Sequence, residues 1–132
     1  MKRTIACLLL LAACASEPPQ PVKPTGPDQA TPDGTVEAWF AAAAKPDREA
    51  MLSLFSPEGR KEEEGFERGW TNALMTRGFT LKSREKISAS VDGESANATF
   101  RAVFVQEGKE HRDGLRFMLG RKDGKWWIVK LG

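Results

Sequence analysis

The sequence predicts an α+β domain, in which short N-terminal helices pack on one face of a four-stranded antiparallel meander. Between residues 31 and 78, apolar side chains recur at the helical spacing of three and four residues, whereas from residue 79 onward they alternate with polar ones. Three turn dipeptides, Asp92-Gly93, Glu107-Gly108 and Asp123-Gly124, divide the alternating part into four strands. Helices followed by a meander form an α+β arrangement, with the apolar face of the sheet against the helices.

The first helix is predicted to begin at Thr31-Pro32, because threonine is a common N-cap and proline is favoured at the first helical position. Asp33 and Glu37 add negative charge near the positive end of the helix dipole. Lys45-Pro46 ends the helix, since proline cannot continue it. The apolar face of this helix is expected to contain Val36, Trp39, Phe40 and Ala43.

Three more helical segments are predicted before the period changes. The segment 47–55 is the first, and Ser56-Pro57-Glu58 restarts a helix with the same signal of cap and proline. A third amphipathic piece runs from about Phe66 to Met75, and Gly78 marks its C-terminal end. Their expected apolar side chains are Ala50, Met51, Leu54 and Phe55 in the first segment, and Phe66, Trp70, Ala73 and Leu74 in the last.

The strands are predicted from the alternation itself. Trp126 and Trp127 are neighbours on the last strand, so one faces the core and the other faces away. Asp113-Gly114 is either part of a longer turn or a bulge. Several strands are also partly apolar on the second face, so part of that face is expected to be covered. One set of alternating residues is Ile87, Ala89 and Val91; Ala98, Phe100, Ala102 and Phe104; Leu115, Phe117 and Leu119; and Trp126, Ile128 and Lys130.

Residues 1–13 have the three parts of a secretion signal. The cationic pair Lys2-Arg3 precedes an apolar run that ends at Leu11, and two alanines then precede Cys14. The apolar run is about half of the roughly 20 residues that a membrane-spanning helix needs, so this segment is not a permanent membrane helix. Leu11-Ala12-Ala13-Cys14 resembles the lipobox of bacterial lipoprotein signal peptides. The alternative is an ordinary cleaved signal in which Cys14 is incidental.

The lipoprotein resemblance implies that cleavage before Cys14 leaves this cysteine as an acylated first residue, which attaches the protein to a membrane. One acyl chain binds a membrane reversibly, whereas two or three make a stable anchor. Ala15 stands where the inner-membrane retention signal of these proteins has aspartate. The expected location is therefore the cell envelope, at the periplasmic face of the outer membrane if the host is Gram-negative.

Residues 14–30 are predicted to be a disordered tether. Val22 is the only large apolar side chain there, which is too little to offset the entropy of ordering the backbone. As extended polyproline II, the tether would hold the domain at most about 50 Å from the bilayer. A proline-rich tract can alternatively be the ligand of an aromatic groove. Its prolines are Pro18, Pro19, Pro21, Pro24 and Pro27.

One domain, residues 31–132, follows the tether. It contains no cysteine, because Cys7 lies in the signal and Cys14 at the anchor, so its core must be stable without a disulfide. Lys2-Arg3 accounts for the difference between 20 basic and 18 acidic side chains, so the mature protein is formally neutral. Its net charge therefore indicates neither a nucleic-acid partner nor another strongly charged one.

Three segments of this domain carry a family resemblance: TPDGTVEAWF (31–40), MLSLFSPEG (51–59) and DGKWWIV (123–129). They resemble small uncharacterised bacterial lipoprotein domains of the nuclear transport factor 2-like superfamily, which have a cystatin-like topology. The resemblance implies a strongly curved sheet around a long N-terminal helix, forming a cone whose open end often holds a ligand or a partner. It also implies that Trp126 and Ile128 face inward, near Trp39 and Phe40. Within this superfamily the fold does not determine the function.

The sequence is poor in catalytic groups. Isomerases and dehydratases of the superfamily use an acid or a histidine as the base, with polarising donors that are often tyrosines. This chain has no tyrosine, and its single histidine, His111, is expected at the surface. Zinc ligands are lacking, and Glu62-Glu63-Glu64 is interpreted as a solvated helix face rather than a metal site. No enzyme activity, cofactor or metal is therefore predicted.

The candidate contact surface lies on the strands. A sheet face that carries Arg101, Arg116 and Trp127 would suit an acidic or sugar-like ligand or a protein edge. The alternative is that the two arginine stems only cover sheet surface. The sequence thus predicts a lipid-anchored envelope protein whose domain is a non-catalytic binding or assembly module. The expected partner of this module is another protein of the envelope. The other two hypotheses are a small cone-pocket enzyme of isomerase or hydrolase type, and a purely structural envelope component.

Overall fold

The computed structural model describes residues 29–132. The predicted signal peptide 1–13, the lipidation of Cys14 and the tether up to residue 28 lie outside the described residues. Within residues 29–132, four helices are followed by four strands, which confirms the α+β class. The elements are α2 (Pro32–Ala44), α3 (Arg48–Leu52), α4 (Pro57–Gly65), α5 (Trp70–Thr76), β2 (Thr80–Asp92), β3 (Ser95–Gln106), β4 (Lys109–Lys122) and β5 (Lys125–Leu131).

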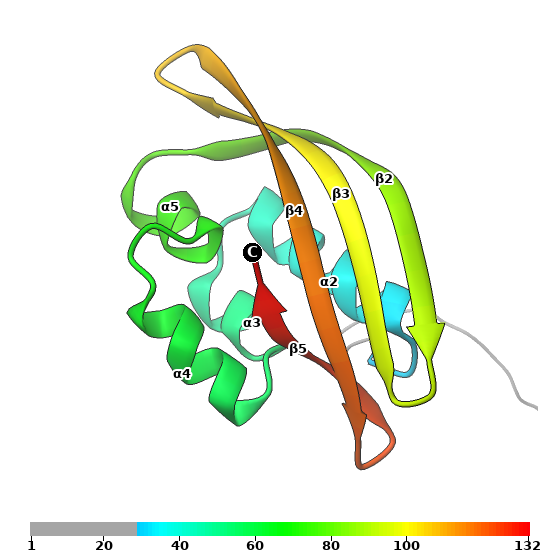
Figure 1. The fold of residues 1–132 in the computed structure, drawn as a ribbon. Coiled ribbons are helices and arrows are strands. Elements are labelled where there is room, and N and C mark those ends of the chain that lie inside the picture. Colours follow the sequence, from blue (N-terminus) through cyan, green and yellow to red (C-terminus); the bar gives the residue numbers. More distant parts are fainter. Residues whose placement is uncertain (1–28) are drawn as a thin grey trace, which may run out of the picture.

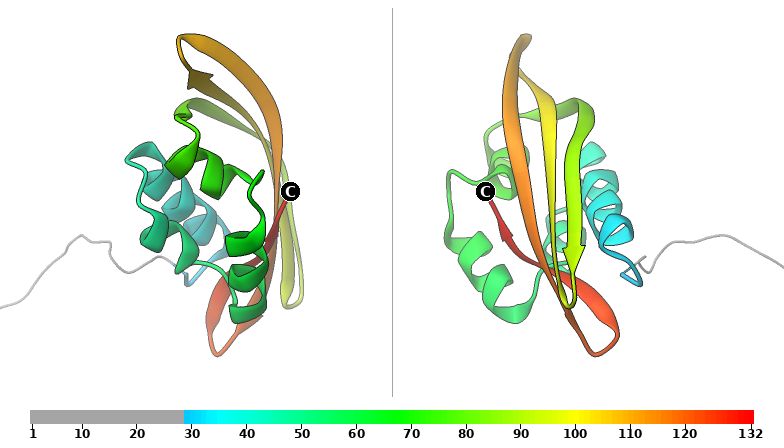
Figure 2. Two further views of the ribbon diagram at one scale, coloured as in Figure 1. Left: turned by 90° about the vertical axis from the view of Figure 1, so that its left-hand side faces the viewer. Right: turned by 45° about the vertical axis from the view of Figure 1, so that its right-hand side comes forward.

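The strands form one antiparallel sheet in the order β2-β3-β4-β5, so each strand pairs with its neighbour in the chain. The sheet is strongly curved, and all four helices lie on its concave side, with α2 running along it (Figures 1 and 2). The convex side, called the outer face below, carries no helix of residues 29–132. Two hairpin turns, at Glu107-Gly108 and Asp123-Gly124, have positive φ at both residues, as expected for tight antiparallel connections.

Side-chain caps fix the starts of three helices, and those at Thr31 and Ser56 confirm the sequence prediction. The Thr31 hydroxyl accepts a hydrogen bond from the backbone N–H of Gly34 at 2.9 Å, at the start of α2. Asp47 caps α3 through the N–H of Ala50 at 3.1 Å. Ser56 caps α4 through the N–H of Gly59, also at 3.1 Å. Each bond satisfies one of the backbone donors that a helix N-terminus leaves unpaired.

The end of α3 and the start of α5 differ from the prediction. α3 stops at Leu52, and Phe55 forms a parallel bridge with Ile128 of β5 instead of completing a helical turn. The last helix begins at Trp70 rather than Phe66, which is 47% exposed. Phe66 is the C-cap of α4, and its carbonyl accepts a hydrogen bond from the Asn72 side chain at 2.9 Å. The helix predicted over about 66–75 was therefore too long, because residues 66–69 belong to the connection between α4 and α5.

Aromatic side chains fill the space between α2 and the sheet. Trp39 and Phe40 of α2 are fully buried, and each ring lies 5.5 Å from the ring of Phe117 on β4. Phe100 of β3 lies 4.8 Å from Phe40. Aromatic rings at these centroid distances are in contact, so no ligand-sized space separates them. The predicted apolar face of α2 is confirmed as core.

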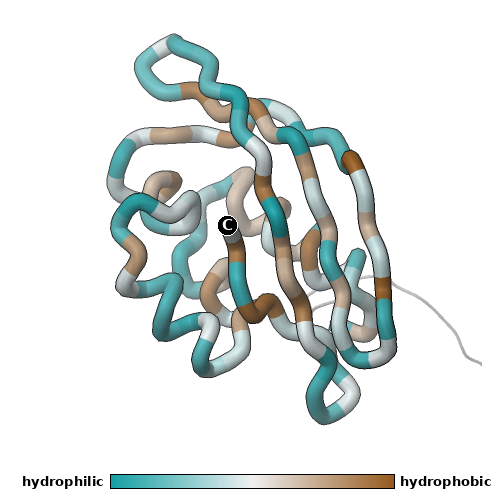
Figure 3. Tube along the Cα trace, in the orientation of Figure 1, coloured by the Kyte–Doolittle hydropathy of each residue, from teal (hydrophilic) through white to brown (hydrophobic). Residues whose placement is uncertain are grey.

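Alternation of apolar and polar side chains is clearest on β3 and β4, where brown and teal positions alternate along the tube (Figure 3). Asp113-Gly114 is neither a turn nor a bulge, because both residues pair regularly with β3, opposite Ala102 and Arg101. Every second residue is buried over 96–104 of β3 and over 115–119 of β4, whereas 109–114 of β4 are all exposed. The buried residues are Ala96, Ala98, Phe100, Ala102 and Phe104 on β3, and Leu115, Phe117 and Leu119 on β4.

The edge strands depart from the predicted alternation. On β2, Ile87 and Val91 are exposed, and a register shift between Lys86 and Ser88 interrupts the pairing with β3. On β5, a shift opposite Met118 and Leu119 reverses the faces after Ile128. Leu131 is buried in consequence, and Lys130 is exposed. A bulge of this kind adds one residue and exchanges the two faces of a strand.

The outer face is also less protected than the sequence suggests. Met118 of β4 is 40% exposed there, whereas Val103 and Val105 of β3 are half-buried by their sheet neighbours. Within residues 29–132, no second layer covers this face.

Candidate functional site

The two adjacent tryptophans of β5 have different environments. Trp126 is only 6% exposed, which confirms that it faces inward. The Thr35 hydroxyl donates a hydrogen bond to its carbonyl at 3.2 Å. Gln29 pairs with it twice, through Trp126 N–H to the Gln29 carbonyl at 2.8 Å and through Gln29 Nε2 to the Trp126 carbonyl at 3.1 Å. Trp127 lies on the outer side, is half-buried, and pairs with Gly120 of β4.

Trp127 borders a groove of about 700 Å³ between the β4–β5 hairpin and the connection from α3 to α4. We call it the Trp127 groove. Its apolar lining comes from Leu52, Phe55, Pro57, Trp127 and Val129. Its polar lining comes from Ser53, Ser56, Glu58, Arg60, Gly120, Arg121, Lys122 and Asp123.

The hairpin holds the Trp127 ring in place. Its indole Nε1–H donates a hydrogen bond to the carbonyl of Lys122 at 3.2 Å, across the turn. The Lys125 ammonium lies 5.9 Å from the ring centroid, within the range of a cation–π contact. Gly120, opposite Trp127, has no side chain that would cover the ring from β4. The ring is therefore oriented by its own hairpin while part of its surface stays accessible.

The opposite wall of the groove is joined to β5 by the backbone. Ser56 N–H donates to the carbonyl of Ile128, and Ile128 N–H donates to the carbonyl of Leu54, both at 2.9 Å. α4 then packs closely on β5 at Gly59. A Cβ atom at this position would lie 2.8 Å from the Val129 carbonyl oxygen, so only glycine permits this approach.

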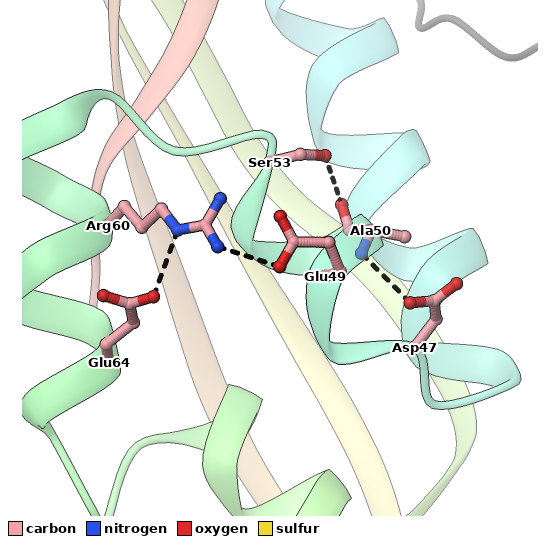
Figure 4. A network of polar contacts seen from close by, with 6 residues as sticks. All are labelled: Asp47, Glu49, Ala50, Ser53, Arg60 and Glu64. Atoms are coloured by element: carbon pink, nitrogen blue, oxygen red, sulfur yellow. Dashed lines mark hydrogen bonds and ion pairs between the residues drawn. The ribbon is translucent and has the colours of Figure 1, made fainter.

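A charged network stabilises the rim of this wall. The Arg60 guanidinium contacts Glu49 of α3 at 2.8 Å and Glu64 of α4 at 3.1 Å (Figure 4). The hydrogen bond from Arg60 lowers the pKa of the Glu49 carboxyl, and the same contacts raise the pKa of Arg60. Two carboxylates thus balance the positive charge of Arg60, which links the two helices that border the groove.

The predicted residues Arg101 and Arg116 lie outside this groove. Both are exposed on the outer face, where Arg116 pairs with Thr99 and Arg101 pairs with Gly114, so the two side chains are diagonal neighbours. Arg101 also forms an ion pair with Glu85 at 3.4 Å. The structure thus places both arginines on the same face as Trp127 but nearer the middle of the sheet.

Glu63 is a candidate that the sequence interpretation missed. It was assigned to a solvated face with Glu62 and Glu64, but its side chain is only 5% exposed, which corrects that assignment. Successive helical residues point in different directions, and Glu63 lies one turn after Gly59, on the face that packs on β5. The spacing of four residues from Gly59 is the sequence signal that could have placed Glu63 on the buried face of α4.

The Glu63 carboxyl is buried without a charged partner. Burial raises its pKa. Neither Glu63 Oε2 nor the Thr71 hydroxyl has a hydrogen-bond partner within residues 29–132. Glu63 also borders a second groove of about 610 Å³, with Phe66 and Leu131 among its other lining residues. We call this the Glu63 groove.

Other chemical features are few. His111 is exposed, as expected, and its ring packs edge-on against Phe79 at 5.1 Å. In the described part of the chain, no three side chains of His, Cys, Asp or Glu come together as metal ligands would. No helix of residues 29–132 combines the length and the apolar character needed to cross a membrane.

The sequence matches no protein-family model and no functionally curated protein. Solved structures do match. A SEC-C motif containing protein from Rhodopseudomonas palustris superposes with a TM-score of 0.65 at 21% identity, covering 79% of each chain. An NTF2-like protein of unknown function from Pseudomonas putida superposes with a TM-score of 0.56 at 13% identity, covering 74% of this chain and 78% of that one.

A third match bears on the enzyme hypothesis. A ketosteroid isomerase-like protein from Erwinia carotovora superposes with a TM-score of 0.52 at 11% identity, covering 74% of this chain and 87% of that one. At such identities a likeness shows the fold alone, and proteins that share a fold differ widely in function. The chain therefore has the nuclear transport factor 2-like fold that its sequence predicts.

Proposed function

We propose that this chain is a lipid-anchored protein of the cell envelope, and that its domain is a non-catalytic binding module with the Trp127 groove as its binding site. The anchor is Cys14, and the location is the periplasmic face of the outer membrane in a Gram-negative host. The observation that carries the binding site is the combination of a half-buried Trp127, oriented by its own hairpin, with an adjoining groove of about 700 Å³.

The chemistry of the groove suits an extended segment of polypeptide. An aromatic ring with a fixed orientation gives a large contact area at low entropic cost, and the neighbouring Pro57 and Val129 extend this apolar surface. Arg121 and Lys122 lie on its rim and form no ion pair within residues 29–132. Their N–H groups are available to backbone carbonyls or carboxylates of a partner.

The anchor is tested by labelling cells with a fatty-acid analogue. Cys14→Ala is expected to abolish incorporation of the label and to move the protein out of the membrane pellet. Cys7→Ala is the matched control and leaves both unchanged, because Cys7 belongs to the removed signal. Continued labelling of the Cys14→Ala protein would show that the anchor lies elsewhere.

The binding site is tested by crosslinking in cells from a photoreactive residue at a defined position. Position 122, on the rim of the groove, is expected to give a specific adduct with another envelope protein, and Trp127→Ala should remove it. Position 101, on the same sheet face but outside the groove, is the control. Equal adducts from both positions would contradict the assignment of the groove.

Glu63 supports a second candidate function, a small isomerase or hydrolase that uses the Glu63 groove. A buried carboxyl with a raised pKa is suited to proton transfer near neutral pH. However, its unpaired oxygen is completely covered, so a substrate would reach it only after a rearrangement. Turnover that is lost in Glu63→Gln and retained in Trp127→Ala would favour this enzyme over the binding module.

A further inference from the structure

The chain enters its domain beside the Trp127 groove. Gln29 pairs with the backbone of Trp126, the residue that precedes Trp127. Trp126 and Ile128 direct their N–H and C=O groups to the same edge of β5, since alternate strand residues bond to the same side. On that edge Gln29 is therefore next to the Leu54–Ser56 segment, which contributes to the wall of the groove. The segment before residue 29 therefore begins next to one wall of the groove, although Gln29 itself does not line it.

That segment has a proline period that matches one backbone conformation. Pro18, Pro21, Pro24 and Pro27 are spaced three residues apart. The polyproline II helix has three residues per turn, so these four rings would line one edge of it. Pro19 lies outside the period. A regular apolar edge of this kind is the form in which proline-rich segments dock on grooves that contain aromatic side chains.

The Trp127 groove has the parts that such a segment requires. Trp127 and Pro57 provide apolar surfaces for proline rings. A polyproline II helix has no internal hydrogen bonds, so its carbonyls need donors. Arg121 and Lys122 on the rim are free of ion pairs within residues 29–132, as noted above, and provide such donors.

The distances permit docking within one chain. Pro21 is eight residues from Gln29, which is about 25 Å at about 3.1 Å per residue, and Pro27 is two residues away. A short covalent connection produces an effective concentration on the order of millimolar, so even a weak contact would be well populated.

We propose that residues 21–27 of this chain occupy the Trp127 groove as a polyproline II segment. This inference rests on the proposed function, because it assigns to the same groove an occupant from within the chain. In the lipid-anchored protein, docking leaves only residues 14–20 as free tether, which span about 20 Å instead of about 50 Å. A partner that displaces the segment would therefore also lengthen the reach of the domain from the membrane.

The test uses the full mature protein, labelled with ¹⁵N on its indole groups, as purified from membranes in detergent. Trp127→Phe identifies the Trp127 Nε1–H signal among the four tryptophans. The triple variant Pro21→Ser, Pro24→Ser, Pro27→Ser is expected to shift this signal and to leave the signal of buried Trp39 in place. Pro19→Ser, outside the period, is the matched control and shifts neither.

Three outcomes are decisive. A Trp127 shift in the triple variant that is independent of protein concentration supports docking within one chain. A shift that disappears on dilution shows that the segment of a second copy fills the groove, which overturns the proposal. No shift also overturns it, and in that case an adduct from position 122 would still support the proposed binding function. A shift without any adduct would leave the tether as the only occupant of the groove and would contradict the proposed partner.

Discussion

The aromatic interior and the Trp127 groove are built on the same sheet, but they differ in what fills them. In the interior, Trp39, Phe40 and Phe117 contact one another ring to ring and are fully buried. In the groove, Trp127 is held only by its own hairpin and faces open space. The concave side of this curved sheet is therefore filled by side chains that stabilise the fold. The space available to a partner lies at the edge of the sheet instead.

The largest expected effect tests the interior. Phe117→Ala should lower the free energy of unfolding by about 3 to 5 kcal/mol, because it removes a fully buried ring that contacts three others. Trp127→Ala should lower it by about 1 kcal/mol or less. Urea denaturation of both variants measures the difference. If Phe117→Ala does not fold, Phe117→Leu should cost about 1 kcal/mol. Similar losses of unfolding free energy in Phe117→Ala and Trp127→Ala would show that the Trp127 ring is packed as tightly as the interior, which contradicts this comparison.

The next effect concerns the wall that separates the groove from the core. Gly59→Ala should destabilise the domain by about 1 to 3 kcal/mol, because its Cβ would overlap the carbonyl oxygens of Ile128 and Val129 at 2.9 and 2.8 Å. Gly65→Ala is the matched control on the same helix, where a Cβ meets nothing within 4 Å. It should be neutral or stabilise by up to about 1 kcal/mol. Thermal unfolding of the two variants is the measurement, and equal midpoints would show that α4 does not pack on β5 as described.

The smallest effect concerns the buried carboxyl. Burial raises the pKa of Glu63 in the folded state, so the folded protein binds more protons than the unfolded one between the two pKa values. Stability from this group is therefore greatest at low pH and falls as the pH rises through the raised pKa. Glu63→Gln should remove this dependence and add on the order of 1 kcal/mol at pH 7.

Glu62→Gln is the control for this prediction, because Glu62 is exposed on the same helix. Denaturation at a series of pH values compares the two variants. If the stability of the wild-type protein and of Glu63→Gln changes with pH in the same way, folding does not raise the pKa of the Glu63 carboxyl.

Local signals accounted for much of the fold. Caps such as Thr31 and Ser56, and turns such as Asp123-Gly124, depend on neighbouring residues, and the structure confirms them. Features that depend on distant contacts were missed. The bridge from Phe55 to Ile128 ends α3 early and forms a wall of the groove, but nothing near Phe55 in the sequence indicates it.

The candidate site was predicted less completely than the fold. Adjacent strand residues must face opposite sides, and the family resemblance indicated that Trp127 is the outward one of the two tryptophans. The structure places it at a groove. Arg101 and Arg116 share its face but not its groove, since the distance along a strand could not be judged without the register. Glu63 was misassigned because its burial depends on how α4 packs on β5, which composition does not reveal.

The two edges of the sheet also differ, and this affects how the protein behaves when it is concentrated. Gln29 and the Leu54–Ser56 segment lie along the edge of β5 that is not paired with β4, and they use its hydrogen-bonding groups. The opposite edge, along the 13 residues of β2, has no strand of residues 29–132 beside it, but it is interrupted by two register shifts. Lys82, Arg84 and Lys86 add bulky charged side chains along it. Such an edge is a poor template for strand addition, so the architecture of the domain disfavours amyloid-like stacking of its chains.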